Sequence, residues 1–151
     1  MKKQINILII VLSICITQSS FGQIPSYPGV DTLPLNKRDS VLKVIAKNVV
    51  MTLGPWYYRD YKIRITDSTW MDDSRRIRPT YVVFYYPDPQ IESFSARFAA
   101  RVTIWKDTGQ ATDVYFGNSR GLDLEDGWPM WNGKIYQMPF YSKPPIKENT
   151  K

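Results

Sequence analysis

The chain has 151 residues, of which 20 are basic, 14 are acidic, one is cysteine and none is histidine. Without histidine, neither a Ser-His or Cys-His nucleophile pair nor an imidazole zinc site can form. The net charge of +6 is spread along the chain rather than gathered into the dense basic stripe of a nucleic-acid binder, so we expect no nucleic-acid partner.

The first 22 residues have the layout of a secretory signal peptide. Two lysines form a basic start, an uncharged and mostly apolar run extends from Ile5 to Thr17, and the small residues Ser20 and Gly22 follow. The run is shorter than the roughly 20 apolar residues that a membrane span needs. We therefore expect residues 1–22 to be removed and the protein to act in the periplasm or as a secreted protein.

The single cysteine, Cys15, lies inside this leader. The remaining chain then has no thiol, so it can form no disulfide and offers no cysteine nucleophile. As an alternative, Leu12-Ser13-Ile14-Cys15 loosely resembles a lipobox, which would anchor the protein through a lipid on Cys15, although Ile14 stands where that motif has a small residue. No second apolar run is long enough to span a membrane, so we expect no integral membrane segment after the leader.

A single long helix is predicted after a short lead-in. Residues 23–35, rich in Pro, Gly, Ser and Tyr, are typical of an extended lead-in rather than of packed structure. Asn36 can cap a helix that ends before Gly54 and Pro55, because glycine accepts a left-handed cap and proline cannot continue the helix. Apolar residues recur at helical spacing at Leu42, Ile45, Ala46, Val49 and Leu53.

After the helix the apolar pattern changes to a period of two. Strands are predicted over residues 61–66, 80–86, 96–105 and 111–116. Residues 71–79 are typical of a charged loop, and Gly109 supplies the positive φ of the tight turn between the last two strands. The Asn-Gly centre of residues 130–136 indicates a further small hairpin.

These elements predict one α+β domain over residues 36–141, followed by a flexible tail over 142–151. The expected fold is one N-terminal helix packed on a curved antiparallel sheet of four or more strands. The helix can bury its apolar stripe on one face of that sheet, whereas the Lys- and Pro-rich tail has little apolar surface to bury.

The hairpin over residues 96–117 carries a resemblance to known folds. Apolar alternation in Phe98–Trp105, a charged turn with Thr108-Gly109, and a returning strand that ends in Gly117 are similar to the closing hairpin of NTF2-fold immunity-like proteins. The same pattern resembles the hairpin of PepSY domains in the cystatin-like group. Both resemblances imply a helix before a curved antiparallel sheet, and a non-enzymatic binding or inhibitory module.

Two sets of residues are candidates for a contact site. Lys62, Arg64, Arg97 and Arg101 fall on the non-core positions of two predicted strands, and they would form one positive face if those strands are neighbours. The alternative is a solvated face on which Asp113 or Glu92 pairs with these cations. Trp128 and Trp131 lie beside glycine and proline, where little sequence is available to bury them, so they are candidates for a protein or sugar contact.

The remaining polar residues indicate neither a catalytic centre nor a cofactor or metal. Asp123, Glu125 and Asp126 lack the spacing of an EF-hand loop. No glutamate lies in a pattern that would bury it and raise its pKa, so no acid-base residue can be named. We therefore expect an exported binding module whose partner is a protein of the cell envelope or a secreted effector that it neutralises. The alternatives are a protein that binds an acidic glycan or another polyanion, and a small NTF2-like enzyme that uses carboxylate or tyrosine chemistry.

Overall fold

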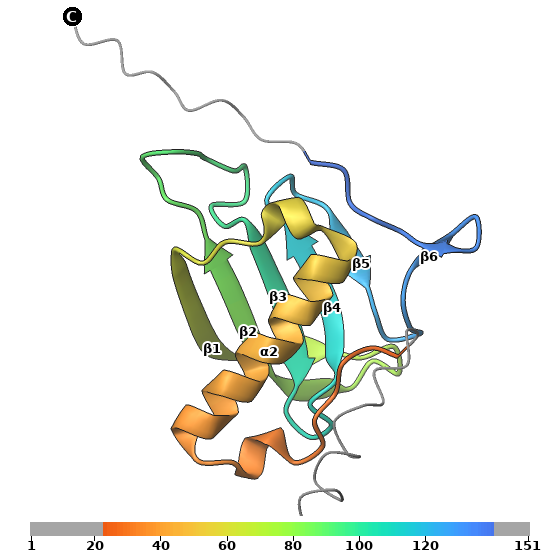
Figure 1. Ribbon diagram of the computed structural model, residues 1–151. Helices are drawn as coiled ribbons and strands as arrows, with labels where there is room; N and C mark the ends of the chain where they lie inside the picture. The colour runs from red at the N-terminus through yellow and green to blue at the C-terminus, as the bar shows by residue number, and fades with distance from the viewer. Residues whose placement is uncertain (1–22, 141–151) are drawn as a thin grey trace, which may run out of the picture.

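The computed structural model describes residues 23–140, so the predicted leader and the predicted tail lie outside the described residues. One long helix, α2 (Leu35–Leu53), lies across one face of an antiparallel sheet with the order β1-β2-β3-β4-β5 (Figure 1). The strands of this sheet are β1 (Lys62–Met71), β2 (Ile77–Tyr86), β3 (Ala100–Trp105), β4 (Ala111–Phe116) and β5 (Gly121–Asp123).

This arrangement confirms the predicted α+β fold, with its N-terminal helix on an antiparallel sheet. The sheet is neither closed nor strongly curled, so the curved sheet and the likeness to NTF2-like or cystatin-like folds stay predictions. No helix among residues 23–140 is both long and apolar enough to cross a membrane.

Helix α2 buries the predicted apolar stripe against the sheet. Leu42, Ile45, Ala46, Val49 and Leu53 are all buried. The prediction that Asn36 caps the helix is wrong, because the helix begins at Leu35 with Pro34 at the N-cap position. The Pro34 carbonyl accepts bonds from the N–H groups of Lys37 and Arg38. Gly54 follows the helix but is not left-handed, since its φ is −160°. Glycine is needed there because a Cβ would lie 2.5 Å from Cε1 of Phe116.

The lead-in is packed against the domain, contrary to the prediction from its composition. Its 3-10 turn η1 (Val30–Thr32) places Val30 in the core, where the side chain is fully buried. The Tyr27 N–H donates to the carbonyl of Gly109, 3.2 Å away in the β3–β4 turn. Composition could not reveal this packing, because the hydrogen-bond partner lies about eighty residues further along the chain.

Strands β1 and β2 form a longer hairpin than the sequence indicates. They pair from Lys62–Tyr86 to Met71–Ile77, so the predicted charged loop is reduced to residues 72–76. Asp72 holds this turn, because its carboxylate accepts bonds from the N–H of Arg76, at 2.9 Å, and from Arg76 Nε, at 3.2 Å. The bond from the Arg76 N–H is the main reason why the pKa of Asp72 is lowered.

The predicted hairpin between β3 and β4 is confirmed, but β3 begins later than expected. Residues 96–99 form an irregular segment before Ala100, and Arg97 has a positive φ of 59°. The Arg97 N–H donates to the carbonyl of Phe94, and the Ala99 N–H donates to Tyr85. The apolar alternation of residues 96–99 therefore belongs to a loop and not to a strand. Arg97 lies in this loop, before β3 begins. Gly109 has the predicted positive φ, at 63°.

The segment after β5 returns along the domain to the end of α2. It contains the predicted small hairpin, β6 (Met130–Trp131) and β7 (Lys134–Ile135), with Asn132 and Gly133 at positive φ in its turn. The Met138 N–H then donates to the carbonyl of Leu53, 2.5 Å away. Tyr57, in the 3-10 turn η2 (Pro55–Tyr57), donates its hydroxyl to the carbonyl of Pro139 at 2.9 Å.

Candidate functional site

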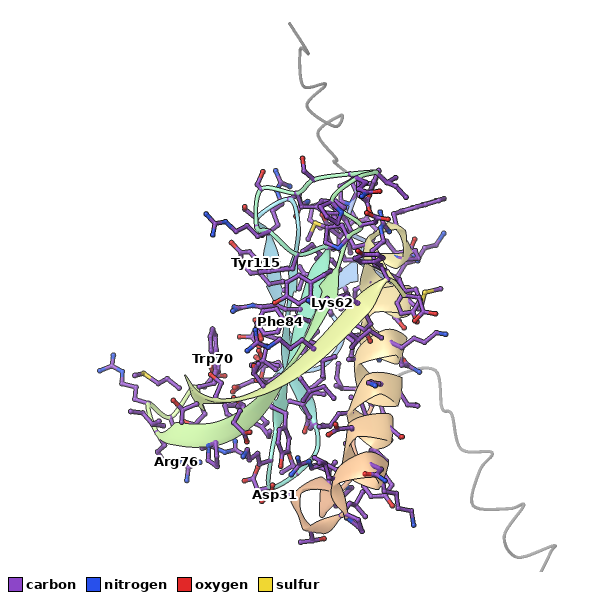
Figure 2. All side chains as sticks on the ribbon, turned by 90° about the vertical axis from the view of Figure 1, so that its left-hand side faces the viewer. Asp31, Lys62, Trp70, Arg76, Phe84 and Tyr115 are labelled. Carbon is purple, nitrogen blue, oxygen red and sulfur yellow. The ribbon has the colours of Figure 1, made fainter. Side chains whose placement is uncertain are left out.

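The face of the sheet that points away from α2 carries a row of alternating cations and aromatic rings. Arg64, Phe84, Arg101 and Tyr115 are consecutive cross-strand partners on β1, β2, β3 and β4. We call this face the open face. Figure 2 shows Phe84 and Tyr115 on this side of the sheet, with Trp70 projecting at the far end of the β1–β2 hairpin.

The aromatic side chains of the open face pack on one another rather than on the helix. Phe98, from the segment before β3, contacts Phe84 at 5.7 Å and Tyr115 at 6.2 Å between ring centroids, both edge to face. Tyr86 stacks on Phe84 at 5.9 Å. Phe84, Tyr86, Phe98 and Tyr115 are only half-buried, so the cluster offers flat apolar area to a partner.

The structure brings the four predicted cations to the open face and its rim. β1 and β3 are not neighbours, because β2 lies between them, and Arg64 and Arg101 instead flank Phe84 from either side. Lys62, Arg64 and Arg97 are exposed, and no ion pair joins any of them to another residue within the range 23–140. Arg101 is half-buried and pairs with Asp113, with Nη2 and Oδ2 3.8 Å apart.

A groove of about 450 Å³ lies beside the open face, between the start of β1 and the segment after β2. Lys62 and Arg97, two of the predicted residues, both line it. Its other lining residues are Tyr61, Tyr86, Pro87, Pro89, Glu92, Ser93 and Phe94. Glu92 is held by Arg59 through two hydrogen bonds, the longer of them 2.6 Å, so the unpaired charge in the groove is positive.

Asp113 and Arg101 form a buried polar centre beneath these rings. The guanidinium of Arg101 lies 5.2 Å from the ring of Tyr115 and 5.8 Å from that of Trp70. Burial raises the pKa of Asp113, although a hydrogen bond with the Thr103 side chain and the charge of Arg101 act in the opposite direction. Within residues 23–140, Asp113 Oδ1 and Arg101 Nε are buried without a hydrogen-bond partner.

Replacing Asp113 by asparagine should raise the Tm at neutral pH and remove part of its pH dependence. A folded-state pKa above the ordinary value of 3.8 means that the native protein binds a proton more tightly than the unfolded chain does. The wild type therefore loses stability as the pH rises through the raised pKa, and the asparagine variant does not. Thermal unfolding followed by circular dichroism from acidic to neutral pH checks this.

Two further results would bear on the same explanation. The exposed Asp126, changed to asparagine in the same way, should leave the Tm curve as it is, because it takes no part in the Asp113 cluster. A Tm for Asp113→Asn that falls below the wild-type value at every pH would contradict the account, because the ion pair with Arg101 would then outweigh the cost of burying the charge.

The two predicted tryptophans do not form a shared platform. Trp131 is 69% exposed at the tip of the β6–β7 hairpin, whereas Trp128 is half-buried and packs against the core.

The acidic residues after β4 are engaged in local hydrogen bonds. Glu125 accepts a bond from the hydroxyl of Thr112 at 2.9 Å, and Asp123 accepts one from the Glu125 N–H at 2.8 Å. In the part of the chain that the structure describes, no group of three His, Cys, Asp or Glu side chains is placed to hold a metal ion.

Comparison with known proteins adds no assignment to this geometry: the chain matches no family model, and no curated protein or solved structure is significantly similar to it.

Proposed function

We propose that this protein is an exported, non-enzymatic binding module that docks an acidic protein through the open face of its sheet. The partner is a protein of the cell envelope or a secreted effector that this protein neutralises. Export, to the periplasm or to the medium, rests on the leader-like residues 1–22, with a lipid anchor on Cys15 as the alternative.

One observation carries the proposal: exposed cations that have no ion-pair partner within residues 23–140 surround aromatic rings that the fold leaves half-covered. Arg78, by contrast, pairs with Asp107 at 2.8 Å. Lys62, Arg64 and Arg97 have no ion-pair partner among residues 23–140, so a partner can use their charge. Interfaces are enriched in aromatic residues and arginine, and complementary charge speeds association and selects the partner.

A cluster of this kind suits a protein better than a flat sugar. Sugar stacking needs exposed rings in one plane, whereas Phe98 packs edge-on against both Phe84 and Tyr115. The two tryptophans also lack a common exposed surface, since only Trp131 is exposed. An acidic protein can place carboxylates on the rim cations and apolar side chains on the rings, which uses both features of the open face at once.

One observation favours an enzymatic alternative. Asp113 is a buried carboxylate with a raised pKa on the open face, and general acid-base catalysis uses such groups. The two functions make different predictions for Asp113→Asn, because this change keeps the size of the side chain and removes only its acidity. A binding module should retain capture of its partner, whereas an enzyme should lose turnover.

Reversing the charge of the three exposed cations should abolish partner capture and leave stability almost unchanged. The variant is Lys62→Glu with Arg64→Glu and Arg97→Glu, and Arg101 is left intact because it packs against Trp70 and Asp113. The immobilised protein is exposed to envelope and extracellular material from its own source, and bound proteins are quantified by mass spectrometry. The wild type should capture one dominant acidic protein, with capture declining as salt is added.

The matched control reverses Lys37 and Lys43, which are exposed on α2. Its two reversals change the net charge by four units, against six units for the triple variant at Lys62, Arg64 and Arg97, here called the rim variant, and they lie on the opposite side of the molecule. We expect the wild type and the α2 control to capture the partner equally well. The rim variant should lose at least tenfold in affinity, which corresponds to roughly 1.4 kcal/mol or more of lost interaction. If the rim variant captures the same protein as well as the wild type does, the proposal fails.

A further inference from the structure

β1 is an unusually open edge of the sheet. It is ten residues long, and its register with β2 is continuous and free of bulges. Among the residues that the structure describes, β2 is its only neighbour in the sheet. The opposite edge, β5, has only three residues. Protein sheets usually protect an edge by keeping it short, by charged side chains, by proline, by a bulge or by a cover. Of these, β1 has only the charged side chains of Lys62, Arg64 and Asp67, as far as residues 23–140 show.

The direction of the free backbone groups on β1 follows from its pairing. The Asp72 N–H donates to the carbonyl of Arg76, so residues of β1 with even numbers turn their N–H and C=O groups toward β2. The odd-numbered residues therefore turn theirs outward: Ile63, Ile65, Asp67, Thr69 and Met71. Between residues 23 and 140, no backbone acceptor lies against these five N–H groups.

Large apolar side chains are exposed at both ends of this edge. Tyr61, just before β1, is 59% exposed, and Trp70 and Met71, at the other end, are 40% and 58% exposed. The charged residues of the strand, Lys62 and Arg64 on the open face and Asp67 on the helix side, lie between these ends. Apolar groups left in water beside unpaired backbone groups indicate that another strand covers the edge.

We infer that the edge is covered by a second copy of this chain, which pairs its own β1 antiparallel about a two-fold axis at Thr66. In this register Tyr61 lies opposite Met71 of the second copy, and Lys62 lies opposite its Trp70. The two-fold axis repeats both pairs, so the exposed apolar residues at each end of β1 face residues of the other copy. Arg64 faces Ser68 of the second copy, and no two like charges are directly opposite. Both outward-facing backbones exchange hydrogen bonds, because Ile63 then pairs with Thr69 and Ile65 with Asp67.

The resulting dimer is one continuous sheet that carries two open faces on the same side. Side chains at even positions of β1 point to the open face in both copies, because directly opposite residues of an antiparallel pair share a face. Arg64 of each copy then lies two residues from the two-fold axis and Lys62 four residues from it, on the same side of the joined sheet. This inference stands independently of the proposed function, because it depends only on the edge and its residues.

The first test removes an outward N–H without touching the pairing of β1 with β2. Thr69→Pro does this at an exposed position, and Thr69→Val is the matched control that keeps the N–H. Sedimentation equilibrium of the purified wild type should show a monomer–dimer equilibrium, retained in Thr69→Val and weakened at least tenfold in Thr69→Pro. Far-ultraviolet circular dichroism of each variant reports whether the fold is intact.

The second test examines the register and does not depend on proline. Ser68→Arg places like charges opposite Arg64 twice in the dimer and should raise the dissociation constant roughly tenfold, whereas Ser68→Glu should lower it by a similar factor. A wild type that stays monomeric at every accessible concentration overturns the inference and leaves the edge to the extended strand of another protein. A dimer that responds neither to Thr69→Pro nor to the two Ser68 changes overturns it as well, because it would use a different surface.

Discussion

Replacing Gly109 by alanine should lower the free energy of unfolding by about 3 kcal/mol. The residue has a φ of 63°, and a Cβ there would lie 2.7 Å from the carbonyl carbon of Tyr27. The lead-in would have to move away from the β3–β4 turn, which breaks the hydrogen bond from the Tyr27 N–H to Gly109 and loosens the packing of Val30. Denaturant unfolding followed by tryptophan fluorescence measures the loss.

Gly133 provides a matched control for this result. Its φ of 72° is similar, but a Cβ there meets nothing within 4 Å. Gly133→Ala should therefore cost about 1 kcal/mol from backbone strain alone. The difference between the two variants isolates the contact with the lead-in. If both glycines cost the same, residues 23–33 are not held against the turn as the structure describes.

Replacing Phe116 by alanine should cost about 4 kcal/mol and has the largest expected effect on the core. The ring is fully buried at the end of β4, where its centroid lies 4.9 Å from that of Tyr57. It also fills the space that Gly54 leaves at the end of α2. The cavity would separate the helix, the sheet and the returning C-terminal segment at the point where all three meet.

Phe84→Ala is the matched control on the other face of the sheet. Phe84 is half-buried among rings and cations of the open face, so its loss should cost only about 1 kcal/mol. The same change should weaken partner capture, whereas any loss of capture in Phe116→Ala should follow from unfolding. Equal destabilisation by the two variants, measured by chemical denaturation, would mean that the open face is as well packed as the core.

The sequence predicts the helix and the hairpin well because each has a local signal. The apolar spacing from Leu42 to Leu53 requires a buried helical face, and the alternation on either side of Gly109 requires two strands joined by a tight turn. For β1 the alternation predicts only residues 61–66, because the polar Ser68 and Thr69 interrupt the apolar pattern beyond them. Their strand depends on pairing with β2 and on the turn that Asp72 holds.

The site was predicted in part. Parity along the strands placed Lys62, Arg64 and Arg101 away from the core, and the structure agrees. The same parity, applied to residues 80–86, would have separated Tyr81 and Tyr85, which face α2, from Phe84 and Tyr86, which face outward. The sequence names Asp113 as a possible partner of the predicted cations, and it does pair with Arg101, but its burial could not be predicted because it results from neighbours on other strands.

The fold explains why no helix among residues 23–140 covers the open face. A single helix can cover only one side of a five-stranded sheet, and α2 covers the side that contains Val83, Val102 and Val114. On the other side the chain supplies rings and arginines instead of a second layer of helices. Antiparallel sheets often leave one face to solvent, so the bare face alone indicates no function, and the proposal depends on the rings and cations that this face carries.

The most direct test of the open face is hydroxyl-radical footprinting of the protein with and without its captured partner. Oxidation of Trp70, Phe84 and Tyr115 should fall on binding, because the partner excludes solvent from these rings, whereas Met51, 45% exposed on α2, should be oxidised equally in both states. Protection of Met51 with unchanged oxidation of Phe84 and Tyr115 would place the partner on the helix and contradict the account.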